Sequence, residues 1–137
     1  MKIVLDTNVL ISALIKAGSP RELFFKITGG KNSLISSKNI IEEFVEVSND
    51  PKIRQYVGEE EVVEFLRVLS KSAKLVRIRS HFKVIKEDPE DDIILRTAVD
   101  GKADFIVSGD KHLLSLGNFR GKQVVTITRM LQILSKY

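Results

Sequence analysis

Four acidic residues occupy positions where alternating strands and helices bring distant side chains together. Two of them come within three residues of the end of an apolar run, and such runs predict strands buried on both faces of a parallel sheet. In an open α/β sheet the ligand crevice lies outside the carboxyl ends of the strands, so these two acids are well placed for chemistry. The other two fall on the inward sides of predicted helices. The four candidates are Asp6 and Asp110 after strands, and Glu43 and Asp91 on helices.

Carboxylates that converge on one crevice repel each other, which raises some of their pKa values unless a cation neutralises them. The chain has no cysteine, and neither of its two histidines stands at metal-ligand spacing. Oxygen ligands alone favour a hard cation, Mg²⁺ or Mn²⁺, over zinc. One or two such ions can activate water and stabilise the charge that develops on a phosphodiester. This set of acids therefore predicts hydrolysis of a nucleic-acid backbone.

Each acid also has an ordinary structural explanation when it is taken alone. Asp6 or Asp110 can cap a helix, Asp91 can interact with the dipole of its helix, and Glu43 can be a solvated edge residue. Their joint occurrence favours the site over these explanations. Neighbouring polar groups are candidates for orienting the ligands, namely Thr7, Asn8, Asp92 and Ser108. His81 and His112 are predicted to be surface residues.

The elements that must position these acids follow from hydrophobic periodicity. We predict strands over residues 3–5, 33–36, 75–79, 103–107 and 124–127. We predict a helix that begins at Val9 with Asn8 as its cap, and further helices over 19–27, 39–48, 59–72 and 129–134. A helix also begins at Pro89, and a short one runs through Leu113. The pattern predicts one domain over residues 1–137, a three-layer α/β/α fold with a parallel sheet flanked by helices on both faces.

Helical phase distinguishes the acids within each helix. Glu43 lies at the edge of an apolar stripe that includes Ile40 and Val47, whereas Glu42 and Glu46 fall opposite that stripe. On the later helix, Asp91 aligns with the stripe Ile94, Leu95 and Ala98, and Asp92 is rotated toward the flank. Glu43 and Asp91 are therefore the acids expected to face inward, although the adjacent pair leaves Asp91 and Asp92 as alternatives for the main ligand.

Charge is unevenly distributed in a chain whose formal net charge is +4. A basic segment precedes an acidic block along the chain. Basic residues around an acidic centre would suit an enzyme that holds phosphates. The alternative is that the two segments form solvated faces of opposite charge. The basic residues are Lys71, Lys74, Arg77, Arg79, Lys83 and Lys86, and the acidic ones Glu87, Asp88, Glu90, Asp91 and Asp92. The sequence shows no secretory signal and no apolar run near the ~20 residues that span a bilayer, so we expect a cytoplasmic protein that contacts no membrane.

Four segments of the sequence together resemble the PIN-domain ribonucleases, particularly the branch described as toxins of toxin–antitoxin modules. The segments are IVLDTNVLISAL, SSKNIIEEFVEV, EDPEDDIILRTAV and ADFIVSGDKHLL, and the resemblance covers nearly the whole chain. It implies an acidic cluster of Asp6, Glu43, Asp91 and Asp110 that binds Mg²⁺ or Mn²⁺ and cleaves RNA. It also implies, more loosely, a homodimer and a small antitoxin partner.

Two other functions compete with this interpretation. One is a non-catalytic RNA-binding module that acts within a larger complex. The other is a haloacid-dehalogenase-like phosphatase, since Asp6 and Asp110 stand in loops like those of that family; Asn8, however, stands where that family usually has a second acid. The sequence does not distinguish among RNA substrates.

Overall fold

The computed structural model describes residues 1–85 and 88–136. Lys86 and Glu87, which end the basic segment and begin the acidic block, lie outside the described residues. Six strands form one sheet in the order β3-β2-β1-β4-β6-β5, in which only the β5–β6 pair is antiparallel. The strands are β1 (Lys2–Leu5), β2 (Ser33–Ser37), β3 (Ala73–Val76), β4 (Phe105–Val107), β5 (Asn118–Phe119) and β6 (Lys122–Val125).

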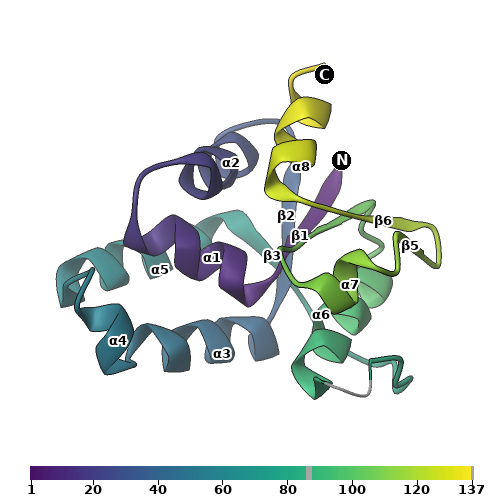
Figure 1. The fold of residues 1–137 in the computed structure, drawn as a ribbon, viewed down its shortest axis with the longest axis horizontal. Coiled ribbons are helices and arrows are strands. Elements are labelled where there is room, and N and C mark those ends of the chain that lie inside the picture. Colours follow the sequence, from purple (N-terminus) through teal and green to yellow (C-terminus); the bar gives the residue numbers. More distant parts are fainter. Residues whose placement is uncertain (86–87, 137) are drawn as a thin grey trace.

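Helices cover both faces of the sheet, as predicted. Figure 1 shows α1, α2, α3 and α5 on one side and α6 on the other. The helices are α1 (Thr7–Ile15), α2 (Ser19–Thr28), α3 (Lys38–Ser48), α4 (Pro51–Arg54), α5 (Glu59–Ser72), α6 (Pro89–Asp100), α7 (Lys111–Leu114) and α8 (Ile127–Leu134). The three-layer α/β/α prediction is therefore confirmed.

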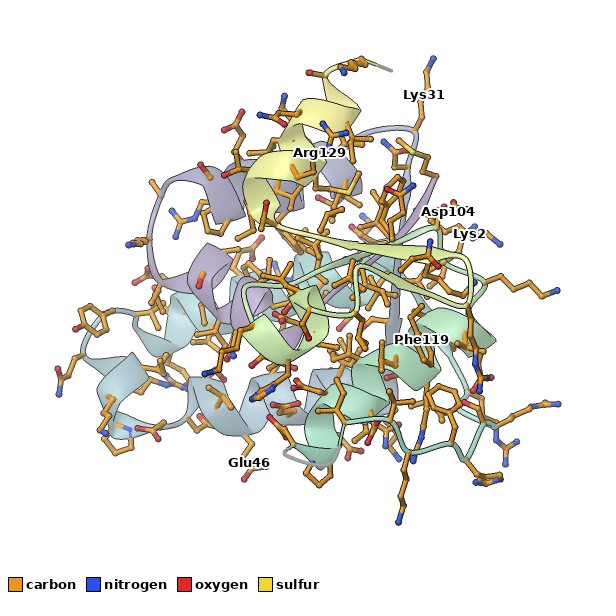
Figure 2. All side chains as sticks on the ribbon, turned by 45° about the vertical axis from the view of Figure 1, so that its right-hand side comes forward. Lys2, Lys31, Glu46, Asp104, Phe119 and Arg129 are labelled. Carbon is orange, nitrogen blue, oxygen red and sulfur yellow. The ribbon has the colours of Figure 1, made fainter. Side chains whose placement is uncertain are left out.

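The central strand β1 is deeply buried and pairs in parallel with β2 and β4. Its residues Ile3, Val4 and Leu5 are at most 1% exposed, which explains their apolar, branched character. At the amino end of this strand, the backbone N–H of Lys2 donates to the carboxylate of Asp104 at 2.8 Å (Figure 2). The Asp104 carboxylate thus makes a structural hydrogen bond at the end of the sheet opposite to the predicted site.

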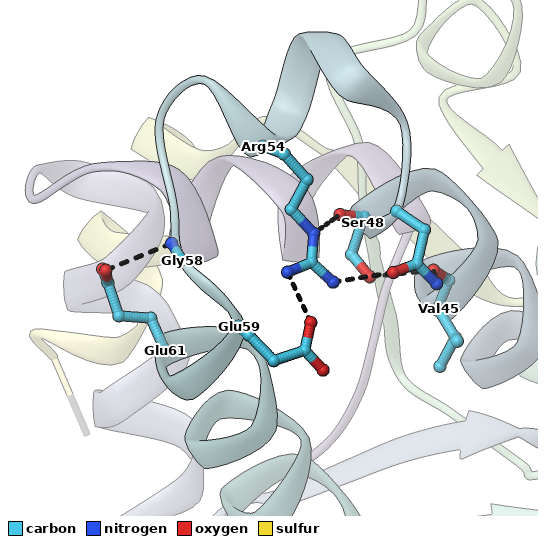
Figure 3. A network of polar contacts seen from close by, with 7 residues as sticks. Val45, Ser48, Arg54, Gly58, Glu59 and Glu61 are labelled. Carbon is cyan, nitrogen blue, oxygen red and sulfur yellow. Dashed lines mark hydrogen bonds and ion pairs between the residues drawn. The ribbon is translucent and has the colours of Figure 1, made fainter.

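Aromatic stacking joins the helices on one face. The ring of Phe65 on α5 stacks on Phe24 of α2 at 4.5 Å and on Phe44 of α3 at 5.2 Å between centroids. Arg54 makes a polar link nearby, where its guanidinium donates to the Ser48 carbonyl, the Asn49 side chain and the Glu59 carboxylate (Figure 3). These contacts fix α3, which carries Glu43, against α4 and α5.

Strand ends differ from the prediction where side chains compete for the backbone. The predicted strand 75–79 is β3, but it ends at Val76. The described residues expected to continue the strand do not pair with β2. Instead, the backbone N–H groups of Arg79 and Ser80 donate to the Asp100 carboxylate at 2.7 and 3.0 Å. The predicted strand 124–127 likewise ends at Val125, because Thr126 caps α8. The hairpin strand β5 was not predicted.

The described residues contain no helix that combines the length and the apolar character needed to cross a bilayer.

Candidate functional site

The carboxyl ends of β1 and β4 form the framework of the candidate site. These strands pair in parallel, with Leu5 opposite Val107, and the N–H of Asp6 donates to the Val107 carbonyl at 3.1 Å. The chain leaves β1 toward β2 on one side, whereas β4 lies on its other side, so the strand order reverses here. Such a switch point opens the crevice in which α/β sheets bind ligands.

Asp6 uses both carboxylate oxygens in its local structure. Its Oδ1 accepts the N–H of Val9 at 2.8 Å, and its Oδ2 accepts a short hydrogen bond from the Ser108 hydroxyl. The helix therefore begins at Thr7 with Asp6 as its cap, so the predicted start at Val9 with Asn8 as the cap was wrong. Asp6 has the extended backbone that a cap requires. Asn8 lies in the first turn of the helix instead, and it is exposed.

Asp110 repeats this arrangement after β4. Its Oδ1 accepts the N–H groups of His112 and Leu113 at 2.8 and 3.2 Å and so caps α7. The Ser108 hydroxyl accepts the N–H of Asp110 at 2.9 Å while it donates to Asp6. Ser108 therefore couples the two loops, and the capping explanation for both acids holds alongside their position at the switch point.

Glu43 is held toward the site by a residue of the first loop. The hydroxyl of Thr7 donates to Glu43 Oε2 at 3.0 Å. Glu43 is half-buried, whereas Glu42 and Glu46 on the same helix are exposed, as the helical phase predicts. Figure 2 shows the side chain of Glu46 directed away from the body of the molecule.

Asp91 and Asp92 are both buried but face different surroundings. Asp91 is 8% exposed, and its Oδ2 has no hydrogen-bond partner among the described residues. Asp92 is turned away, because its Oδ1 accepts the N–H groups of Val84 and Ile85 at 2.8 and 3.0 Å. Asp92 thus anchors the segment that precedes α6, and Asp91 is the member of the pair that faces the other acids.

One pocket of about 250 Å³ collects the four predicted acids. Asp88, which was not predicted as a site residue, also lines the pocket. Its membership of the acidic block was the sequence feature that could have indicated this. Five of the described lining residues are acidic and none is basic. Asp92 and Ser108 lie behind the lining. The lining residues are Asp6, Thr7, Asn8, Glu43, Val47, Asp88, Asp91, Ile94 and Asp110.

Burial and mutual repulsion perturb the acids of the pocket. Burial, together with the negative charges of Asp110, Asp88 and Asp6, raises the pKa of Asp91 to about 7. Burial also raises the pKa of Asp6, and the charge of Asp110 adds to this effect, although hydrogen bonds from Ser108 and Val9 oppose it. The described lining residues therefore hold several carboxylates close enough to perturb one another.

The donor chemistry of the pocket fits a hard divalent cation, although the described residues present no group of three acids or histidines already placed to hold a metal ion. Mg²⁺ usually keeps several waters and binds through one or two carboxylates, so a cage of protein ligands is not required. The unpartnered Oδ2 of Asp91 is a buried carboxylate oxygen of the kind that such an ion would satisfy.

Comparisons with known proteins cover the same region. A family model described as a PIN domain matches residues 2–112, a span that includes all four predicted acids and ends before β5. An uncharacterized protein of Methanocaldococcus jannaschii is 34% identical over 118 residues, which cover 85% of this chain and 75% of that protein.

Proposed function

The chain belongs to the PIN domain family, and from this premise we propose that it is a divalent-metal-dependent endoribonuclease that hydrolyses RNA phosphodiester bonds. Membership in this family supports nuclease chemistry. The observation that carries the proposal is the convergence of Asp6, Glu43, Asp91 and Asp110 in one pocket at the switch point of the sheet.

Asp6, Glu43, Asp91 and Asp110 are the residues that would hold Mg²⁺ or Mn²⁺. When bound, the ion supplies an activated water and stabilises the charge that develops on the phosphodiester. The protein contributes orientation: backbone N–H groups and Ser108 fix the carboxylates of Asp6 and Asp110, and Thr7 fixes Glu43. Such outer contacts keep metal ligands in position before substrate arrives.

Substitution of Asp6 by asparagine tests the proposal. Asparagine caps helices as well as aspartate does, so Asp6→Asn keeps the start of α1 while it removes the charge. We expect Mn²⁺-dependent RNA cleavage to fall by more than about 100-fold, since even outer-shell changes at metal sites cost roughly 10- to 100-fold. Cleavage at the rate of the parent protein would reject the nuclease assignment.

Asp50→Asn is the matched control for this experiment. Asp50 caps α4 through the N–H of Lys52 at 2.9 Å but does not line the acidic pocket. The same chemical change at a second helix cap should leave cleavage unchanged. Salt-sensitive RNA binding without cleavage under any divalent ion would instead favour a non-catalytic RNA-binding module. The observation that favours this second candidate is that the described residues hold no preformed group of three metal-binding side chains.

We further propose that the protein is the toxin component of a toxin–antitoxin module, with a small antitoxin as partner and a homodimer as its assembly. This rests on the resemblance of its motifs to that branch of the family. Expression of the parent protein should then arrest growth, and expression of Asp6→Asn should not. A small adjacent gene for a DNA-binding protein whose co-expression restores growth would identify the antitoxin.

A further inference from the structure

A second hollow in the molecule has the opposite charge. This cationic groove, of about 580 Å³, lies between the start of α3, the end of β3 and the middle of α6. Figure 1 shows these three elements close together at the lower right of the sheet. Its lining includes Lys38, Arg77, Arg96 and His81, and no acidic residue of the described chain is among its lining residues.

The cationic groove and the acidic pocket are lined by different residues of the same two helices. Helix α3 supplies Lys38 to the groove and Glu43 to the pocket, and α6 supplies Arg96 to the groove and Asp91 to the pocket. The members of each pair are five positions apart, which is about 7.5 Å along a helix axis and about 140° around it, so they lie on different faces of their helix. The Thr97 hydroxyl donates to Ser37 at 3.0 Å and pins the two helices together beside the groove.

Lys38 is the first residue of α3, an unfavourable place for a cation because the helix dipole is positive there. Among the described residues, its ammonium makes one ion pair, an exposed contact with Glu42 at 3.7 Å, and its side chain is 86% exposed. Such a pair contributes little to stability. The position of Lys38 is therefore better explained by attraction of an external anion than by the stability of the helix.

The wall that carries Arg77 and His81 is held by contacts at both ends. Asp100 accepts the N–H groups of Arg79 and Ser80, as described above, and Arg96 donates to the Phe82 carbonyl at 2.9 and 2.6 Å. The Arg77 side chain is exposed and makes no ion pair with the described residues. The backbone that carries Arg77 and His81 is thus held in place beside α6.

We propose that the cationic groove holds the sugar-phosphate backbone of a single-stranded segment of the nucleic acid whose cleaved bond lies in the acidic pocket. The nature of the ligand rests on the proposed function. Arg77 and Lys38 contact phosphates, and Leu75, which is 57% exposed in the lining, packs against an unpaired base. Single-strand sites combine such charge with surfaces for bases, whereas the bases of a duplex are stacked inside it.

Charge reversal at two positions tests the site. The variant Lys38→Glu/Arg77→Glu is compared with Lys31→Glu/Arg129→Glu, which changes the net charge equally. Figure 2 shows Lys31 and Arg129 at the opposite end of the molecule from Glu46 of α3. Binding of a labelled single-stranded RNA is measured by fluorescence anisotropy with EDTA present, so that no divalent ion takes part and no strand is cleaved.

We expect the groove variant to bind at least roughly tenfold more weakly than the parent, and the control variant to stay within about twofold. The slope of log affinity against log salt should decrease by about 1.4 for two lost phosphate contacts. Equal weakening in both variants, or none in either, overturns the proposal. The proposal is also overturned if the groove variant binds RNA as the parent does but no longer binds a polyglutamate peptide, because the groove would then be a site for acidic polypeptides.

The outcome is separable from that of the nuclease assignment. Asp50→Asn lies outside both the groove and the acidic pocket and should bind RNA in EDTA as the parent does. If Asp6→Asn still cleaves RNA while the groove variant fails to bind, the assigned catalytic site is wrong and the groove stands. If the glutamate variant does not fold by circular dichroism, Lys38→Gln/Arg77→Gln replaces it, with Lys31→Gln/Arg129→Gln as its control.

Discussion

Asp6 and Asp110 each use one carboxylate for two purposes. Both cap a helix through backbone N–H groups, and both line the acidic pocket. From the sequence, the cap and the pocket were alternative explanations for the same residue. They are compatible because a short loop joins each strand to the next helix, so a cap side chain in that loop faces the crevice of the sheet.

The ambiguity between Asp91 and Asp92 shows where sequence reasoning reaches its limit. Helical phase correctly directed Asp91 toward Ile94 and the other inward residues. It did not indicate that Asp92 is buried as well, at 4% exposure, because the N–H groups that it accepts come from the segment before the helix. A contact with an irregular segment has no periodic signature in the sequence.

The raised pKa of Asp91 predicts a pH dependence of stability. Its pKa is 3.8 in the unfolded chain and about 7 in the folded protein, so between these pH values the folded protein binds more protons. The free energy of unfolding therefore falls as pH rises from about 4 to 7. Asp91→Asn removes this penalty, and its melting temperature relative to the parent should increase from pH 4 to pH 8, measured by circular dichroism in EDTA.

Asp50→Asn controls for loss of an aspartate in general, and its difference in melting temperature from the parent should show no such increase. A difference between Asp91→Asn and the parent that stays constant from pH 4 to pH 8 would show that Asp91 is not buried against its acidic neighbours.

Among the elements, the long periodic ones were predicted best. Helix α5 has the predicted bounds, Glu59–Ser72, because its apolar face packs through Val62, Phe65 and Leu69. The two-residue strand β5 was missed because it exists only through antiparallel pairing of Phe119 with Lys122 on β6. Such short strands depend on tertiary pairing and carry little local pattern.

Close packing of α6 against the sheet predicts a large effect at the glycine that follows it. A Cβ at Gly101 would lie 2.5 Å from Ile35 Cγ2, 2.8 Å from Val76 Cγ2 and 2.9 Å from the Thr97 carbonyl oxygen. We expect Gly101→Ala to lower the free energy of unfolding by about 1–3 kcal/mol, as overpacking does. Urea unfolding followed by circular dichroism measures the change.

Gly109→Ala is the control for this substitution, since its added Cβ would meet nothing within 4 Å. Its free energy of unfolding should stay within about 0.5 kcal/mol of the parent. Equal stability of the two variants would contradict the close approach of α6 to β2 and β3.

At the scale of the whole molecule, a net charge of +4 conceals two opposed local fields. Different residues of α3 and α6 line the acidic pocket and the cationic groove. The sequence showed the basic segment and the acidic block as neighbours along the chain. It could not show that Lys38, far from both in sequence, completes the groove, because that depends on how β2 and β3 pair.

A cation that binds only the folded protein should stabilise the whole molecule. At a concentration 100-fold above the dissociation constant, Mn²⁺ is expected to raise the free energy of unfolding by about 2.7 kcal/mol. Thermal unfolding with and without Mn²⁺ measures this gain. Asp6→Asn should lose most of it, whereas Asp50→Asn should keep it; equal gains in both variants would place the ion elsewhere.

The order of the strands also determines when the pocket can exist during synthesis. Asp6, Glu43 and Asp91 leave the ribosome before β4, the strand that pairs beside β1 and is followed by Asp110. A nascent chain halted before β4 carries three of these acids but lacks the loop that joins Ser108 to Asp6. The pocket therefore cannot assemble until β4 and the loop that carries Ser108 and Asp110 have been synthesised.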